Sequence, residues 1–118
     1  MATIEHVLAV AAVTDLERAC DFYSRLFGRE PDNRPMETLA EWRVTGSGWL
    51  QVFVHPDRAG QAFVNFAVDD LATILDDLRV RGLTPGDVQD ADKGVQLSAL
   101  TDPDGNTITL IGGFRISY

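Results

Sequence analysis

Two histidines are the side chains of this sequence best suited to chemistry. Imidazole is the usual general acid or base near neutral pH and a common metal ligand, so His6 and His55 are candidates for either role. His6 lies in an apolar, β-branched segment, where a histidine can equally do no more than hydrogen-bond a neighbour. His55 ends an apolar run before Pro56, and we expect it at a rim or on the surface. No carboxylate clearly completes a metal site, because Glu37 and Glu41 are expected in or near a mobile loop.

A second set of residues favours binding rather than catalysis. It combines aromatic rings with neutral groups that donate and accept hydrogen bonds, which is the composition of many small-molecule pockets. Its members are Trp42, Trp49, Phe53, Phe63, Gln51, Asn65 and Thr109. The same rings are also compatible with a role limited to filling the core, and the sequence leaves both alternatives open. Cys20, the single cysteine, lies on an apolar helical stripe and is interpreted as a small buried hydrophobe that forms no intramolecular disulfide.

The composition indicates one soluble domain. Its 118 residues are enough for a real core, and 45% of them are hydrophobic. A net charge of -8 argues against a nucleic-acid partner, whose phosphates require basic patches, but leaves a small cationic ligand possible. The first residues lack a basic and apolar leader, and no apolar run approaches the roughly 20 residues of a membrane span. We therefore expect a cytoplasmic protein without a membrane partner.

The elements that must position these side chains begin with a strand and a helix. Apolar residues recur at three- and four-residue spacing after Thr14 and Asp15, either of which can cap a helix, and Gly28 ends the helix that this spacing predicts. The other elements expected in the first half are a strand at 4–10, a loop or irregular edge strand at 29–38, and a hairpin of strands 39–45 and 49–55.

The same order of elements begins again after Gly60. Asp69 and Asp70 cap a second helix, which ends at Gly82. The other elements expected here are a strand at 61–68, a loop with at most a short strand at 83–92, and a hairpin of strands 95–100 and 107–111. A unit repeated after about 50 residues implies two similar modules that share a core, the first at about 1–57 and the second at about 61–113.

Three fragments of this repeat resemble the vicinal oxygen chelate superfamily, the group of glyoxalases, bleomycin-resistance proteins and extradiol dioxygenases. They are Val13-Thr-Asp-Leu-Glu-Arg-Ala19, Phe22-Tyr-Ser-Arg-Leu-Phe-Gly28 and Asp102-Pro-Asp-Gly-Asn106. The resemblance implies an α+β fold of two tandem βαβββ modules, whose strands form a curled, cup-like mixed sheet with the helices outside. It also implies a homodimer.

Alternation along the strands divides their side chains between the two faces of such a sheet. The set assigned to the helix side is Leu50, Val52, Val54, Val64, Phe66, Val68, Ile108 and Leu110. The set assigned to the cup is Trp49, Gln51, Phe53, His55, Phe63, Asn65, Thr107 and Thr109. Trp42 is expected to line the cup as well.

Metal-binding members of the superfamily place histidine or carboxylate ligands on inner strands of the cup. At three of the corresponding positions this sequence has Gln51, Phe63 and Thr109, which are weak ligands or none. His6 is the only candidate on the first strand, although counting back from Val13 puts Leu8 at the usual ligand spacing. The resemblance therefore favours a protein without a metal or other cofactor, with His6 as a weak metal candidate.

Two functions from different classes follow, and the sequence leans against an enzyme. The preferred one is a metal-independent protein that holds an aromatic or cationic small molecule in the apolar cup, contacted by His6 and by the aromatic and neutral polar set named above. We expect Trp42→Ala or Trp49→Ala to weaken that binding without unfolding the protein. The alternative is a metal-dependent lyase, isomerase or dioxygenase of the glyoxalase type that uses His6. A scaffold domain with a vestigial pocket is a third possibility.

Overall fold

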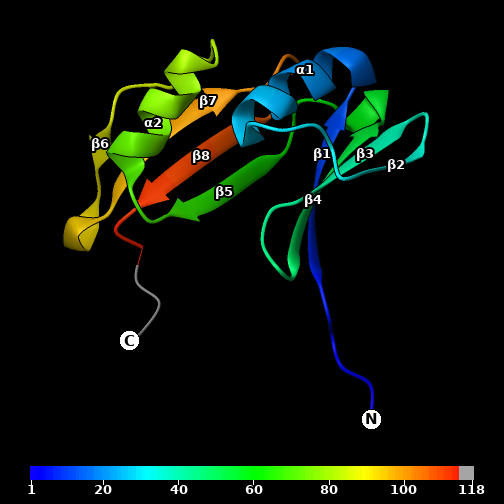
Figure 1. Cartoon of the computed structure of the whole chain (residues 1–118), viewed down its shortest axis with the longest axis horizontal. Coiled ribbons are helices and arrows are strands. Elements are labelled where there is room, and N and C mark those ends of the chain that lie inside the picture. Colours follow the sequence, from blue (N-terminus) through cyan, green and yellow to red (C-terminus); the bar gives the residue numbers. More distant parts are fainter. Residues whose placement is uncertain (115–118) are drawn as a thin grey trace.

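Two modules of the same architecture make up the protein (Figure 1). The computed structural model describes residues 1–114. The first module contains β1 (Val7–Val13), α1 (Leu16–Phe27), β2 (Asn33–Met36), β3 (Leu39–Arg43) and β4 (Gly48–Val54). The second contains β5 (Phe63–Val68), α2 (Leu71–Val80), β6 (Gln89–Asp90), β7 (Gln96–Thr101) and β8 (Thr107–Gly112). The predicted α+β class with two βαβββ modules is confirmed.

Each module forms its own four-stranded mixed sheet. The strand orders are β1-β4-β3-β2 and β5-β8-β7-β6, so the first and last strands of each module lie side by side. These pairs are parallel, and the other pairs are antiparallel. Helix α1 packs on β3 and β4, and α2 packs on β8. The strands thus form two separate sheets instead of the one curled, cup-like sheet that was expected. The strands of the two sheets run in different directions in Figure 1.

The first strand begins later than predicted. It covers Val7–Val13 instead of 4–10, because its parallel pairing with β4 continues to the pair of Val13 and Val54. Ile4 is 90% exposed, whereas Val13 is fully buried. The apolar, β-branched content of a segment is a local signal, but the pairing partner decides where a strand starts. His6 therefore lies just before the strand instead of inside it.

The capping residues confirm the predicted helix ends. The Asp15 carboxylate accepts hydrogen bonds from two backbone N–H groups of the first turn of α1 (2.9 and 3.2 Å), so Asp15 rather than Thr14 is the cap. Asp70 caps α2 through one such bond of 3.0 Å. Gly28 follows α1 with a φ of 72°, a left-handed conformation that glycine reaches without strain. Local sequence thus determines both helix starts and the end of α1.

One hydrophobic core joins the two modules. Alternate residues of the central strands are buried under the helices as predicted, and Leu50, Val52 and Ile108 are each 0% exposed. The same core continues into α1 and α2 through Tyr23 and Leu78, which are also fully buried. The longest helix, α1, has 12 residues, and in the part of the chain that the structure describes no helix is long and apolar enough to cross a membrane.

The turn between β7 and β8 holds the modules together. Asn106 is fully buried and donates its amide N–H groups to the Ala12 carbonyl of β1 (2.7 Å) and to Asp102 (2.8 Å), while its oxygen accepts from Ala62 N (2.9 Å). Asp102 also accepts a 2.7 Å hydrogen bond from the Tyr23 hydroxyl of α1. Burial, and then the negative charge of Asp102, raise the pKa of Tyr23, so its hydroxyl stays a donor. The turn therefore fixes β8 against both β1 and α1.

Candidate functional site

The side chains that point away from the helices form what we call the open face of each sheet. Directly paired residues point to the same side of a sheet, so the strand register defines this face. On the first sheet it carries Leu8, Val10, Trp49, Gln51, Phe53, Glu41 and Arg43. On the second sheet it carries Phe63, Asn65, Ala67, Thr107, Thr109 and Ile111. The cup residues assigned by alternation on these strands lie on this face, whereas their contact with a ligand stays a prediction.

The open face leaves large apolar side chains in contact with solvent. Phe63 is 82% exposed, and Leu8 and Val10 are 47% and 48% exposed. On the opposite, helix-covered side of the two sheets, Leu50 of β4 and Val64 of β5 are buried. An uncovered apolar area with interspersed polar groups is typical of a surface that binds a ligand or a partner.

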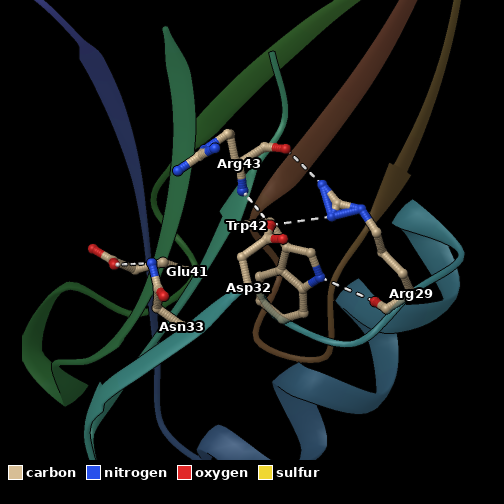
Figure 2. A network of polar contacts seen from close by, with 6 residues as sticks. All are labelled: Arg29, Asp32, Asn33, Glu41, Trp42 and Arg43. Atoms are coloured by element: carbon tan, nitrogen blue, oxygen red, sulfur yellow. Dashed lines mark hydrogen bonds and ion pairs between the residues drawn. The ribbon is translucent and has the colours of Figure 1, made fainter. Parts of the chain in front are cut away.

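Trp42 does not belong to the open face, so the prediction that it lines the cup is wrong. It pairs with Leu50 and is 0% exposed, and its ring centroid lies 5.9 Å from that of Tyr23 and 5.7 Å from that of Phe27. Its indole N–H donates to the Arg29 carbonyl at 3.1 Å (Figure 2). The register of β3 against β4 decides which side Trp42 takes, and the composition of β3 alone does not reveal that register. Trp42 therefore fills the core beneath α1.

Glu41 is a residue of the open face that sequence reasoning missed. It falls within the strand expected at 39–45 but was set aside as lying in or near a loop, and the structure places it on β3 opposite Gln51. The Gln51 amide donates to its carboxylate at 2.7 Å. The Asn33 amide donates to the other carboxylate oxygen at 3.5 Å (Figure 2). Alternation was the available signal, because Glu41 and Arg43 stand two residues apart on one strand and so share a face.

A network of polar contacts fixes the backbone of Arg43 (Figure 2). Asp32 accepts from Arg43 N at 2.6 Å and pairs with the Arg29 guanidinium at 3.1 Å. That guanidinium also donates to the Arg43 carbonyl at 2.5 Å. The Arg43 side chain extends over the open face, where its guanidinium carbon lies 4.8 Å from the centroid of the Trp49 ring. The first sheet thus carries a cation stacked on an indole.

His6 reaches the same region although it precedes β1. Its ring centroid lies 6.1 Å from that of Trp49 in an edge-to-face arrangement. The Trp49 indole nitrogen is buried and has no hydrogen-bond partner within residues 1–114. We call the region formed by His6, Arg43 and Trp49 the Trp49 corner. It brings nitrogen groups that can donate hydrogen bonds next to an aromatic surface.

Hollows adjoin the open face on both sheets. One of about 190 Å³ lies between β1, β4 and β5 and includes Trp49, although Val7, Ala9, Val64 and Phe66 of its lining belong to the helix-covered side. Another, of about 280 Å³, includes Thr109 together with Asp87 and Gln89. A larger hollow of about 590 Å³ lies apart from them, between α1 and the end of β7, with Arg18 and Thr84 in its lining. Another hollow, of about 330 Å³, includes Val10 of the open face. The candidate site is therefore a shallow surface with small hollows rather than one deep cavity.

The donor groups of the open face do not fit a catalytic metal centre. Among the residues that the structure describes, no three His, Cys, Asp or Glu side chains gather to hold a metal ion. Gln51 gives its amide to Glu41, and Phe63 has no ligand atom. Thr109 pairs with Asn65, so a neutral hydroxyl stands beside a neutral amide. His6 belongs to no such group, and the Glu41 carboxylate of this face is hydrogen-bonded by Gln51 and Asn33, whereas a stable centre needs three or four ligands.

Comparison with known proteins agrees with this fold. The sequence profile described as "Glyoxalase-like domain" matches residues 8–111. A glyoxalase / bleomycin resistance protein from Catenulispora acidiphila is 31% identical, with a TM-score of 0.85 over 91% of this chain and 96% of that chain. No curated protein matches the chain significantly.

Two further solved structures share the fold. A bleomycin-binding protein complexed with bleomycin is 22% identical, with a TM-score of 0.76 over 92% of this chain and 98% of that chain. An antibiotic-binding protein from Streptomyces sp. CB03234 is also 22% identical, with a TM-score of 0.73 over 95% and 98% of the two chains. At this identity these two likenesses concern the fold alone. The profile match spans both modules from β1 to β8, and the chain therefore belongs to the glyoxalase-like domain family of the vicinal oxygen chelate superfamily.

Proposed function

We propose that this protein binds a small aromatic or cationic molecule on its open face without the help of a metal. The observation that carries the proposal is the open face itself, where aromatic rings, apolar side chains and neutral amides and hydroxyls lie uncovered by any helix. In fold the chain is similar to a bleomycin-binding protein and an antibiotic-binding protein. We extend small-molecule binding from those proteins to this chain.

The contacts of the open face support an aromatic ligand more than a cationic one. Arg43 already stacks on the Trp49 ring, so a second cation at that place would meet repulsion. The net charge of -8, which favours cations, acts over the whole surface and not at this place. The side chains proposed to contact the ligand are His6, Trp49, Gln51, Phe53, Phe63, Asn65 and Thr109.

Trp49→Ala should weaken ligand binding at least about tenfold, because the largest aromatic surface of the site is lost. The fold should stay cooperative, since Trp49 is only partly buried. The measurement is a thermal-shift screen of the full chain against planar aromatic compounds, followed by calorimetric titration of each compound that raises Tm. A ligand at 100 times its Kd stabilises the folded state by about 2.7 kcal/mol, which raises Tm by roughly 10 °C in a domain of this size.

Val80→Ala is the matched control, because Val80 is 87% exposed on α2 and far from the open face in the fold. It should leave Kd unchanged, and so should addition of EDTA to the wild-type protein. The proposal fails if no compound raises Tm. It also fails if EDTA abolishes binding and a divalent metal restores it, a result that would favour the metal-dependent alternative.

We also propose that two copies of the chain pair through β1 and Phe63. The single chain leaves large apolar side chains exposed here, with Val7 at 71% and Phe63 at 82%. Phe63→Asp should convert a dimer into a monomer, because dimerisation would have to bury an unpaired charge. Sedimentation velocity measures the mass of each form, with Val80→Asp as the control that should remain dimeric. A wild-type protein of single-chain mass at micromolar concentration would refute this pairing.

A further inference from the structure

The Arg43 guanidinium is held in place but has no acidic partner. Its backbone N–H and carbonyl are fixed by Asp32 and Arg29, so the side chain leaves β3 from a rigid base. Over residues 1–114 the guanidinium takes part in no ion pair and no hydrogen bond, whereas those of Arg29 and Arg79 pair with aspartates. The guanidinium carbon lies over the Trp49 ring, 4.8 Å from its centroid, which puts the guanidinium N–H groups next to that ring. Arg43 therefore presents hydrogen-bond donors beside Trp49.

Trp49 supplies a second donor without a partner. Its indole nitrogen is buried and unbonded within the described residues, and buried polar groups normally have a partner. The other tryptophan follows that rule, because Trp42 donates to the Arg29 carbonyl at 3.1 Å. An indole nitrogen can only donate, so the group that would satisfy Trp49 must be an acceptor. The nitrogen has almost no accessible surface, so an acceptor on the open face reaches it only when the Trp49 ring turns.

The nearest carboxylate of the open face is already engaged. Glu41 stands two residues from Arg43 on β3, and its oxygens accept from Gln51 at 2.7 Å and from Asn33 at 3.5 Å. No ion pair forms between Glu41 and Arg43 within 4.0 Å. The Glu41 carboxylate is thus hydrogen-bonded by neutral amides, whereas the Arg43 guanidinium has no partner among the described residues.

From these observations we infer that the ligand of the open face is an aromatic acid, whose anionic oxygen atoms accept from Arg43 and Trp49. The inference rests on the proposed binding function and names its ligand class. A carboxylate matches the planar guanidinium in shape, and its second oxygen can take the indole N–H. The net charge of -8 repels an anionic ligand only weakly at this place. Salt screens the interaction between exposed charges that are more than about 8 Å apart at physiological ionic strength.

Three naphthalene probes with a negative, a neutral and a positive substituent test the inference on the full chain. They are 2-naphthoate, 2-naphthamide and 2-naphthylmethylammonium. The chain has two tryptophans and so gives two indole N–H signals in a ¹⁵N–¹H spectrum, which Trp49→Phe assigns. Naphthoate should bind most tightly and shift the Trp49 signal downfield. The Trp42 signal should stay in place, because its hydrogen bond lies in the core.

Arg43→Gln should raise the Kd of naphthoate about tenfold and leave that of naphthamide within about twofold. Arg79→Gln is the matched control, since Arg79 pairs with Asp76 on the surface of α2, and it should change neither value. The inference is overturned if the ammonium probe binds more tightly than naphthoate, if Arg43→Gln leaves naphthoate binding unchanged, or if no probe binds. The proposed function still holds in each of these cases if a compound from the thermal-shift screen binds and Trp49→Ala weakens that binding. Failure of the aromatic-acid inference can therefore be told apart from failure of the proposed function.

Discussion

Trp42→Ala should lower the free energy of unfolding by about 3–5 kcal/mol, the range for removing a large aromatic side chain from a core. Trp42 is 0% exposed, and its ring lies against Tyr23 and Phe27. The substitution also leaves the Arg29 carbonyl without its indole donor. Urea unfolding followed by circular dichroism measures the change, with the m-value showing whether unfolding stays two-state. This result would replace the expectation that Trp42→Ala affects binding alone.

Trp49→Ala is the control for this loss of stability. Both substitutions remove an indole, but Trp49 lies on the open face and has no hydrogen bond to lose. Its loss should cost no more than about 1.5 kcal/mol, because the side chain keeps part of its contact with water. Equal losses of stability in the two variants would contradict the placement of Trp42 in the core and Trp49 on the surface.

Asp102→Ala should destabilise the protein by about 3 kcal/mol or more, because several buried donors lose their acceptor at once. These donors are the Tyr23 hydroxyl and the Asn106 side-chain amide. The backbone N–H groups of Asp104 and Asn106 also donate to the same carboxylate, at 3.0 and 2.9 Å. The measurement is again urea unfolding, read together with Tm.

Asp104→Ala is the matched control in the same turn. Asp104 accepts from the Thr14 N–H and hydroxyl at 3.0 and 2.7 Å, but these bonds are exposed, so we expect a loss of about 1 kcal/mol. Tyr23→Phe removes one donor of the network and should cost a similar amount. If Asp102→Ala cost no more than Asp104→Ala, the turn would not be the link between the modules that its buried hydrogen bonds indicate.

Local chemistry made much of the fold predictable. Asp15, Asp70 and Gly28 act within one turn of the helices that they delimit, so their residue types were enough to place those ends. Alternation along β4, β5 and β8 assigned the buried and open sides, because a strand turns successive side chains to opposite faces. The turn at 102–106 was expected to join two strands, and it is one of the fragments that carry the family resemblance. Its buried bonds to Tyr23 and Ala12 depend on distant elements and could not be foreseen.

The site was harder to predict because pairing between strands decides it. The register of β3 against β4 puts Trp42 in the core and Glu41 and Arg43 on the open face. That register depends on contacts across the sheet, which no short segment contains. The stacking of Arg43 on Trp49 follows from the same pairing, since the two residues are opposite each other. Sequence reasoning therefore found the face but not its charged groups.

The most direct test of the central claim is a ¹⁵N–¹H chemical-shift map of the full chain with a bound aromatic ligand. If the open face is the binding surface, the largest shifts fall on Trp49, Gln51 and Asn65, and the indole signal of Trp42 does not move. Shifts concentrated instead at Arg18 and Thr84, in the hollow between α1 and β7, would place the ligand elsewhere and contradict the claim.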